Sequence, residues 1–371
     1  MRAHIRKKLS HKGLPVTRTR LFRILRLTCL LAAFAVAGAP FTASAGQVAA
    51  APKTTAKAPV KKTTTTAAQR AAARRAAARR VAAARAAAAA KALREAQQPQ
   101  FKLDETGALV PHSRAAAAII YNPATGQVLW EENSNDQRSI ASITKVMTAL
   151  VFMEDAPDLT REVVVDRADV RAASTTYLRA GYKITTDNLL HLLLIASDNA
   201  AARVLARVSP QGSKGFIVRM NEKAKELGLE HTSYTDPSGL LSDNVSSAYD
   251  MARLITFAAG DETISSIMRT PTYSFNVGRR TIAVHSTNQL VRSGDVDVLG
   301  GKTGFIRKAG YCLATLLRLP QGGPQVAVVV LGANSNAGRF WETRHLFNWL
   351  STKAADLLGG ATPEPVAAAA N

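Results

Sequence analysis

The net positive charge of this chain is concentrated in its first hundred residues, and this confines a folded core to the remainder. The 371 residues carry a formal charge of +21, to which residues 1–45 contribute +9 and residues 46–100 contribute +11. Residues 101–371 are therefore nearly neutral. A segment rich in Lys, Arg, Ala and Thr but poor in large apolar residues cannot bury enough surface to fold. Because the folded part carries almost no net charge, no nucleic-acid partner is expected.

Residues 1–45 have the pattern of an export signal. A basic region at 2–26 precedes an apolar run at 27–39, and small residues at 43–45 provide a cleavage site. The run is shorter than the ~20 residues that span a bilayer. We therefore expect a cleaved signal peptide, secretion across the inner membrane, and a periplasmic or cell-wall-associated mature protein.

Residues 46–110 are expected to form a basic tether. Residues 67–97 consist largely of Ala and Arg, with arginine at every fifth position from Arg70 to Arg85. Both residue types favour a helix, but this spacing distributes charge around the helix and leaves no apolar face. Two interpretations stay open: a solvated tether, or a polycation that binds anionic envelope polymers or lipid headgroups through residues 46–100.

Residues 111–352 show strand patterns at both ends of a helical middle. Strands are expected at 115–121, 127–132, 298–305, 310–319 and 325–332, and helices at 139–153, 187–196, 200–208, 215–227, 247–258 and 341–350. This order predicts an α/β domain in which helices flank an antiparallel sheet, with a helical subdomain. Residues 353–371, rich in Ala and Pro, are expected to be disordered.

The first of three chemical motifs is Ser142-Ile143-Thr144-Lys145, at the start of an apolar helix. A spacing of three places Ser142 and Lys145 on one helix face, about one turn apart. A serine hydroxyl becomes nucleophilic when a base takes its proton, and a lysine is such a base when burial lowers its pKa. The helix N-terminus favours anionic character at Ser142. The motif therefore predicts an activated serine.

The second motif, Ser197-Asp198-Asn199, interrupts two apolar helices. The Ser197 hydroxyl and the Asn199 amide are therefore expected at a junction inside the core. Ser242-Asp243-Asn244 and Ser286-Thr287-Asn288 share the S-x-N pattern, but these residue types are common in ordinary turns and caps. The order of the three motifs favours Ser197 over both.

The third motif, Lys302-Thr303-Gly304, lies on an expected strand, where Lys302 and Gly304 share one side. The lysine can bind a substrate carboxylate, and the glycine allows a substrate backbone to approach. The N–H groups of Phe305 and Ser142 are candidates for an oxyanion hole. A Walker phosphate loop is excluded because Val296 stands where that motif requires glycine and no helix follows.

Metal and cofactor chemistry have little support in the sequence. No pair of histidines has metal-ligand spacing, so neither a metal site nor another cofactor is expected. A Ser-His-Asp triad stays open on spacing alone, but no set of partners stands out.

The order of the three motifs is the signature of penicillin-binding proteins and class A β-lactamases. Over residues 112–350 the chain resembles the low-molecular-weight penicillin-binding proteins, the D-alanyl-D-alanine carboxypeptidase/endopeptidase family. The resemblance implies a serine β-lactamase/DD-peptidase-like fold. It is carried by residues 141–148, 236–240 and 302–313, and residues 286–290 resemble the shorter, endopeptidase-like branch.

This resemblance implies a serine-type D-Ala-D-Ala peptidase that acts on peptidoglycan stem peptides through an acyl-enzyme, with β-lactam antibiotics as covalent inhibitors. Ser142 would be the nucleophile and Lys145 its base. The other implied roles are substrate positioning and proton relay by Ser197 and Asn199, and substrate binding by Lys302, Thr303, Gly304 and Phe305.

Two departures from the family pattern affect this expectation. Ile306 stands where many members have threonine. The residues after Leu350 are too few for the β-rich domain and amphipathic anchor of many carboxypeptidases, which favours cleavage of cross-links.

Two other classes of function remain open. A class A β-lactamase needs a glutamate to activate the deacylating water, and residues 230–241 offer Asp236-Pro237 but no clear counterpart. A non-catalytic cell-wall-binding protein would use the basic tether. Intact Ser142, Lys145 and Lys302 argue against that alternative.

Overall fold

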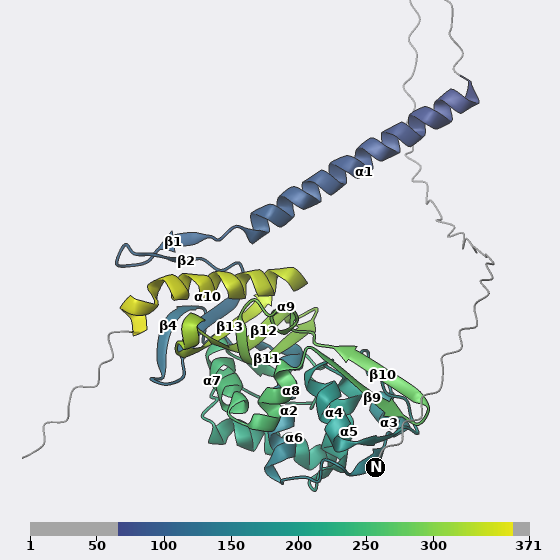
Figure 1. Cartoon of the computed structure of the whole chain (residues 1–371), viewed down its shortest axis with the longest axis vertical. Coiled ribbons are helices and arrows are strands. Elements are labelled where there is room, and N and C mark those ends of the chain that lie inside the picture. Colours follow the sequence, from purple (N-terminus) through teal and green to yellow (C-terminus); the bar gives the residue numbers. More distant parts are fainter. Residues whose placement is uncertain (1–65, 359–371) are drawn as a thin grey trace, which may run out of the picture. The chain divides into compact units, whose positions relative to one another are not determined.

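A five-stranded antiparallel sheet organises residues 66–358, the part of the chain that this computed structural model describes (Figure 1). Its strands in spatial order are β11 (Asp297–Ile306), β12 (Gly310–Arg318), β13 (Gln325–Ala333), β3 (Ala117–Asn122) and β4 (Gln127–Glu132). The pairing of β13 with β3 joins the two ends of the domain. The α/β fold class with an antiparallel sheet is confirmed.

Side chains along each strand alternate between two apolar cores. In β3, Ile119 belongs to the core on the helical side, whereas Ile120 belongs to the core beneath α10 (Asn336–Leu358). In β13, Val329 and Val328 divide in the same way. Because helices cover both faces of the sheet, these strands are nearly continuous apolar runs.

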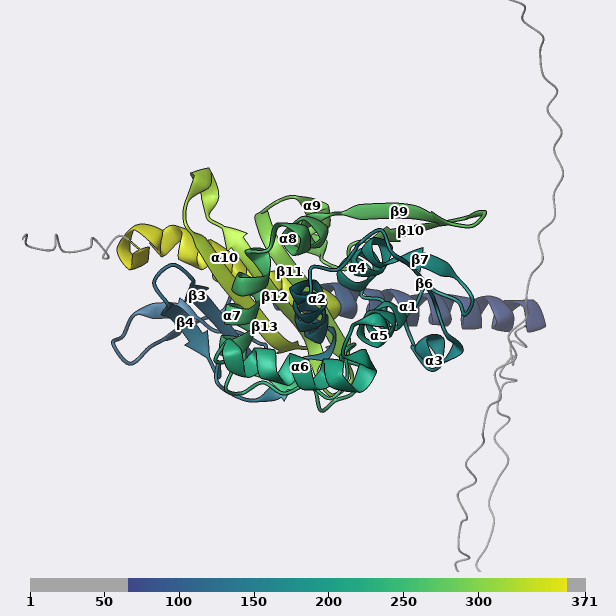
Figure 2. The same ribbon diagram turned by 90° about the horizontal axis from the view of Figure 1, so that it is seen from below.

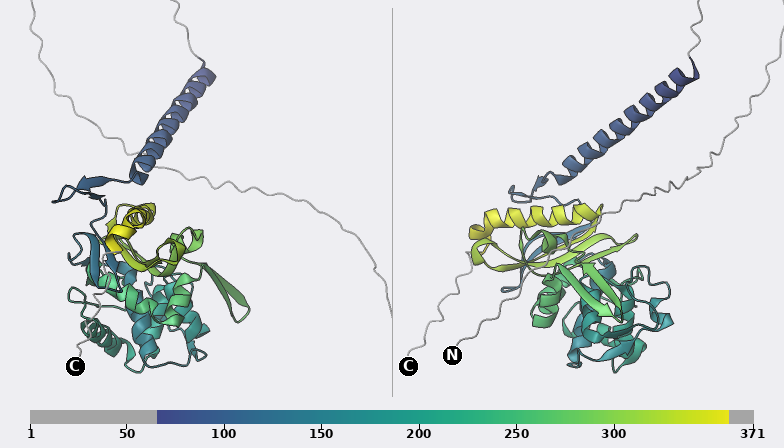
Figure 3. Two further views of the ribbon diagram at one scale, coloured as in Figure 1. Left: turned by 60° about the vertical axis from the view of Figure 1, so that its left-hand side comes forward. Right: turned by 45° about the vertical axis from the view of Figure 1, so that its right-hand side comes forward.

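Helices cover the two faces of the sheet unequally. On one face, α10 packs on β12 and β13 (Figure 3). On the other face lie α7 (Ala248–Ala259) and α8 (Glu262–Arg269), which pack on the sheet strands. The helical subdomain continues from that face (Figure 2). It contains α2 (Thr144–Glu154), α4 (Thr186–Leu194), α5 (Asn199–Val208) and α6 (Gly212–Glu226).

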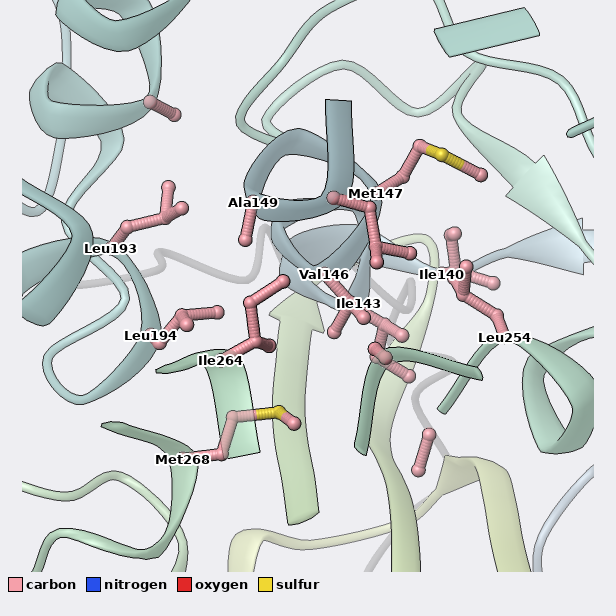
Figure 4. Close-up of a cluster of buried hydrophobic side chains, with 14 of the residues drawn as sticks. Ile140, Ile143, Val146, Met147, Ala149, Leu193, Leu194, Leu254, Ile264 and Met268 are labelled. Carbon is pink, nitrogen blue, oxygen red and sulfur yellow. The ribbon is translucent and has the colours of Figure 1, made fainter. Parts of the chain in front are cut away.

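Helix α2 is the centre of the helical subdomain. It contacts α4, α5, α6 and α7. Figure 4 shows Val146 and Ile143 from this region beside Leu194 of α4, Leu254 of α7 and Ile264 of α8. Helix α2 is thus buried on nearly every side, and the 3₁₀ turn that precedes it, η1 (Ala141–Ile143), contacts β11 and β12.

Shorter elements complete the described chain. They are a 3₁₀ turn η1 (Ala141–Ile143), α3 (Arg167–Val170), α9 (Gln289–Ser293), the 3₁₀ turn η2 (Pro320–Gly322), and the pairs β1 (Phe101–Leu103) with β2 (Leu109–Pro111), β5 (Arg138–Ser139) with β8 (Val245–Ser246), β6 (Glu162–Val164) with β7 (Lys183–Thr185), and β9 (Thr272–Val277) with β10 (Arg280–His285). None of the helices within residues 66–358 combines the length and the apolar character needed to cross a membrane.

Two boundaries differ from those predicted. Residues 101–111 form the β1–β2 hairpin, although the sequence assigns residues 101–110 to the tether. Phe101 of this hairpin packs edge-on against His345 of α10, with ring centroids 5.0 Å apart. Helix α10 continues past residue 352 to Leu358, since Leu357 still packs on the adjacent core. The expected signal peptide at 1–45, the tether at 46–65 and the tail from 359 lie outside the described residues.

Helix α1 (Ala67–Gln97) carries no buried side chain among those that are described. Alanine and arginine supply its helix propensity, and no apolar face contributes. Near its end, Arg114 Nη2 donates to the carbonyl oxygens of Glu95 and Gln98 at 2.9 and 3.0 Å. These contacts satisfy carbonyl groups that a helix C-terminus leaves without partners.

Asn244 fastens the loop before it to the start of α2. Its Oδ1 accepts from the backbone N–H groups of Thr235 and Asp236 at 2.8 and 3.1 Å. Its Nδ2 donates to Thr144 Oγ1 at 3.0 Å and to the Asp236 carbonyl at 2.8 Å. The side chain is fully buried. The Ser242-Asp243-Asn244 segment is therefore a structural element, as the turn chemistry predicts.

The Asn244→Ala variant should lose about 3 kcal/mol of unfolding free energy, because several buried polar groups lose their partner at once. Urea unfolding of the purified protein measures this loss. Asp243→Ala, at an exposed position of the same segment, is the control and should change the value by less than about 0.5 kcal/mol. Equal stability of the two variants would contradict the role assigned to Asn244.

Candidate active site

Ser142 lies at the mouth of a cleft of about 420 Å³ between the helical subdomain and the edge strand β11. It is in the 3₁₀ turn η1, directly before α2, rather than inside the helix as the sequence suggests. The preceding Ala141 has φ +49, in the left-handed region that non-glycine residues rarely occupy. This turn presents the hydroxyl at the N-terminal end of α2, where the helix dipole favours negative charge.

The Lys145 amine is held in place by three oxygen atoms. Its Nζ lies 2.9 Å from Ser142 Oγ, 2.7 Å from Asn199 Oδ1 and 2.5 Å from the Ser238 carbonyl oxygen. A neutral amine has two N–H donors and one lone pair. Donation to Asn199 and Ser238 leaves the lone pair for the Ser142 hydroxyl proton. The arrangement therefore suits Lys145 as a base toward Ser142.

Burial supplies the electrostatic condition for this role. The Lys145 side chain is fully buried, and burial lowers its pKa from 10.5 to about 7. Asp236 and Asp198 oppose this shift, and Arg203 adds to it. The burial of an ammonium group without a paired carboxylate costs free energy, which favours the neutral amine. At neutral pH a large fraction of Lys145 is therefore deprotonated.

The junction between α4 and α5 positions Ser197 and Asn199. Ser197 has φ +59, which lets the chain turn sharply between the two helices. Asp198 caps α5 by accepting from the Ala201 N–H at 2.9 Å, and it also accepts from the Tyr177 N–H at 2.6 Å. Burial raises the pKa of the Asp198 carboxyl. Asp198 is thus a positioning residue that sets its two neighbours in the motif.

Lys302 approaches Ser197 from the opposite wall of the cleft. Its Nζ donates to Ser197 Oγ at 2.8 Å and to the Thr303 carbonyl at 3.0 Å. Burial first, and then the positive charges of Lys145 and Arg339, lower its pKa well below the usual value. An arriving carboxylate would offset this effect by supplying the missing counter-charge.

Packing alone requires a glycine at position 304. A Cβ at this position would lie 2.5 Å from the Ile140 carbonyl oxygen and 3.3 Å from the Ser142 nitrogen. From the sequence, a glycine is expected here because it would allow a substrate backbone to approach. The structure shows a second cause, which is the close contact of position 304 with η1. By lying against this turn, β11 brings Phe305 to the cleft that Ser142 also lines.

The loop after Pro237 is a part of the site to which the sequence assigns no role. The Asp236 carboxylate accepts hydrogen bonds from the N–H groups of Ser238, Gly239 and Leu241. The loop therefore curves around this carboxylate. A Cβ on Gly239 would lie 1.9 Å from the Ala141 carbonyl oxygen, so the loop packs directly on η1. This fold aims the Ser238 carbonyl at Lys145. In the sequence, the family resemblance of residues 236–240 is the feature that points to this loop.

Thr287 and Arg339 also line the cleft. Thr287 belongs to the segment 286–290 that resembles the endopeptidase-like branch, whereas no sequence motif indicates Arg339. Thr287 Oγ1 lies 2.6 Å from Thr303 Oγ1. Arg339 Nη1 donates to the carbonyl oxygens of Gly304 and Cys312 at 2.9 and 3.1 Å. Burial lowers the pKa of Arg339 to about 10, and no carboxylate of the described residues lies within ion-pair distance of it. Thr287 lies between β10 and α9, and Arg339 lies in α10, so both residues are far from the three motifs in the chain and come to the cleft through the tertiary fold.

The lining of the cleft is cationic. It contains Arg307 and Arg339, and no aspartate, glutamate or histidine of the described residues takes part. A histidine-dependent triad therefore has no partner in this cleft. The surroundings suit a substrate that carries a carboxylate.

The profile of a known family, D-alanyl-D-alanine carboxypeptidase, matches residues 104–335 of the chain. The chain belongs to this family.

Relatives of this family member include endopeptidases and carboxypeptidases. The D-alanyl-D-alanine endopeptidase of Pseudomonas aeruginosa is 32% identical over 260 residues, which cover 69% of this chain and 81% of the relative. That of Escherichia coli is 32% identical over 267 residues, which cover 71% and 84%. The D-alanyl-D-alanine carboxypeptidase DacF of Bacillus subtilis is 34% identical, over 60% of this chain and 58% of the relative.

Solved structures of the family share the fold. The Streptomyces K15 DD-transpeptidase superimposes with a TM-score of 0.61 and 29% identity, covering 64% of this chain and 97% of that one. A D-alanyl-D-alanine carboxypeptidase from Mycobacterium tuberculosis gives a TM-score of 0.59 at 27% identity, covering 69% and 94%. The chain is therefore a low-molecular-weight penicillin-binding protein with the serine DD-peptidase fold.

The rate of Ser142 acylation by a fluorescent penicillin should rise about tenfold per pH unit up to about pH 7 and then level off, since Lys145 must lose its proton to act as a base. Stopped-flow or quenched labelling at several pH values measures the rate. Lys145→Met, of similar length, should lower it by about 10²- to 10⁴-fold. A rate independent of pH below 7, or an unimpaired Lys145→Met variant, would contradict the assignment.

Proposed function

We propose that this protein is a D-Ala-D-Ala peptidase that cleaves peptidoglycan cross-links as an endopeptidase through an acyl-enzyme on Ser142. The observation that carries the proposal is the buried Lys145 amine 2.9 Å from the Ser142 hydroxyl, with its pKa lowered to about 7. A nucleophile within hydrogen-bond distance of a base that is neutral at working pH is the requirement for covalent catalysis.

In the acylation step, Ser142 Oγ attacks the carbonyl carbon of the D-Ala residue whose peptide bond is cut, while Lys145 takes the hydroxyl proton. The N–H groups of Ser142 and Phe305 stabilise the negative charge on the carbonyl oxygen, as the packing of Gly304 on η1 supports. The proton that Lys145 takes from Ser142 must reach the leaving amine, and the Ser197 hydroxyl, which accepts from Lys302, is placed to relay it from Lys145 to that amine.

The positive charges of the cleft select the substrate. The Lys302 ammonium and the Thr303 hydroxyl bind the carboxylate of the leaving D-residue. Arg339 is buried without a carboxylate partner among the described residues, and its positive charge also attracts the substrate carboxylate. Asn199 orients the substrate amide and keeps Lys145 in place at 2.7 Å. A charge-assisted bond to a carboxylate is worth about twice a neutral one.

A β-lactamase function is less well supported. Rapid hydrolysis of a penicilloyl-enzyme in class A enzymes uses a glutamate that activates water. No carboxylate lines the described part of this cleft. The acyl-enzyme formed with a penicillin is therefore long-lived, and β-lactams act as covalent inhibitors.

The comparisons favour cleavage of cross-links over removal of a terminal residue. Three relatives named D-alanyl-D-alanine endopeptidase match over 78–84% of their own length. The carboxypeptidases DacF of Bacillus subtilis and DacC of Escherichia coli match over 58% and 62% of theirs. The D-alanyl-D-alanine carboxypeptidase of Streptomyces sp. strain K15 matches over 89% of its length, so coverage alone does not separate the two activities. Its identity is 27%, against 32% for each of the three endopeptidases, and this difference supports the endopeptidase proposal.

We also propose an extracytoplasmic location, periplasmic or associated with the cell wall. The export pattern of residues 1–45 and the peptidoglycan substrate support it. Helix α1, with seven arginines and one lysine against Glu95, would bind anionic envelope polymers or lipid headgroups by electrostatic attraction.

Purified disaccharide-peptide dimers incubated with the protein should be converted to monomers, as followed by mass spectrometry. The Ser142→Ala variant should leave the dimers intact, because no acyl-enzyme can form. Asp243→Ala, away from the cleft lining, is the control for handling and should cleave at the wild-type rate. Loss of a single alanine from pentapeptides, with dimers unchanged, would show a carboxypeptidase. No cleavage of either substrate would contradict the enzyme proposal.

A further inference from the structure

The turn between β11 and β12 places a cation, Arg307, at the catalytic cleft. Arg307 lines the cleft and is exposed to solvent. Its side chain forms neither a hydrogen bond nor an ion pair with any of the described residues. Asp243, in the loop that contributes Leu240 to the lining, lies outside the lining itself and is not paired with Arg307. The guanidinium is therefore available to a substrate.

Packing fixes the backbone of this turn. Ala309, two residues after Arg307, is buried. Gly310 has φ +69, and a Cβ at this position would lie 3.1 Å from the Cα of Gly332 in β13, so the turn packs directly on the sheet. The Arg307 side chain is exposed, but the backbone that carries it is held in place. Such support is typical of residues that position a ligand.

Two groups on β11 set the direction in which the substrate lies. Lys302 binds the carboxylate of the leaving residue, and the Phe305 N–H binds the carbonyl oxygen of the bond that is cut. Strand β11 is the edge strand of the five-stranded sheet, where an extended peptide can pair with it. The acyl part of the substrate must then continue beyond Phe305. Arg307 lies two residues further, about 7 Å along the chain, and therefore beside the residues that precede the acylated D-Ala.

Phe305 offers an apolar surface on the same path. Its ring is 50% exposed and stacks on Tyr311, with ring centroids 4.2 Å apart. An exposed ring held in a cleft by stacking can contact the aliphatic part of a substrate. On the donor side of Ser142, the cleft thus combines an apolar contact at Phe305 with a cation at Arg307.

We propose that Arg307 forms a second carboxylate subsite, which binds an acidic residue of the donor stem peptide one or two positions before the acylated D-Ala. This inference rests on the proposed function and adds the chemistry of the donor side to it. Lys302 and Arg307 then hold carboxylates on opposite sides of the bond that is cut. A guanidinium can bind a carboxylate through two parallel hydrogen bonds, so this pair helps to align the donor carbonyl with Ser142. A donor whose carboxylates are replaced by carboxamides is a poorer substrate.

Two synthetic disaccharide-peptide dimers that differ only in the donor stem test the proposal on the full mature chain. In one dimer the carboxylates of the two residues before the acylated D-Ala are free, and in the other they are carboxamides. The wild type should cleave the first dimer with a kcat/KM about three- to tenfold higher, because the ion pair is partly exposed to solvent. In about 1 M NaCl this preference should fall below about twofold, since salt screens exposed charges.

Arg307→Gln should cleave the two dimers with equal kcat/KM, whereas Arg307→Lys, which keeps the charge, should retain part of the preference. Lys308→Gln is the matched control and should keep the wild-type preference, because Lys308 is exposed on the same turn but does not line the cleft. A stable penicillin adduct on each variant verifies that the catalytic domain is folded.

Equal cleavage of both dimers by the wild type, or an unchanged preference in Arg307→Gln, would overturn the donor subsite. The endopeptidase proposal would survive either result, because the dimers are still cleaved. If the wild type cleaves neither dimer, the proposed function is wrong and the donor subsite is wrong with it. The two failures are therefore distinguishable in one experiment.

Discussion

The burial of the Lys145 amine is the interaction on which the rest of the site depends. An ammonium group removed from water without a carboxylate partner is unfavourable, and the protein responds by lowering its pKa to about 7. The neutral amine then needs acceptors for its two N–H groups, which Asn199 and the Ser238 carbonyl supply. Three segments far apart in the chain must therefore meet at one nitrogen atom, and the helical subdomain brings them together.

Strained backbone at two positions makes this meeting possible. Ala141 and Ser197 both have positive φ values, which cost about 1–3 kcal/mol each at non-glycine residues. Asp198, by capping α5, fixes the turn at Ser197. Gly239 and Gly304 allow the loop after Pro237 and strand β11 to pack closely on the turn at Ala141. The strain is held by packing and hydrogen bonds around the cleft, so the Ser142 hydroxyl stays in its reactive position without substrate.

The sequence predicts the parts of this site better than their assembly. Helix and strand periodicity locates most elements. Motif order distinguishes Ser197 from Ser242, and the segment of Ser242 has a structural role because Asn244 hydrogen-bonds to Thr235 and Thr144. The role of Arg339 is not predictable, because this side chain reaches the cleft only when α10 packs on the sheet. Thr287 lies in a segment that carries the family resemblance, but its contact with Thr303 depends on the packing of the β10–α9 connection on β11. Likewise, nothing local in the sequence shows that residues 101–111 fold back on α10.

The central claim, that Lys145 is a neutral base at physiological pH, is tested most directly by its own titration. Carbon-13 NMR of protein labelled at the lysine Cε position, with the resonance assigned by its loss in Lys145→Met, reports the protonation of this amine. We predict a midpoint near 7, well below the surface lysines at about 10.4. A midpoint near 10 would show that Lys145 is an ammonium during catalysis and would contradict the mechanism.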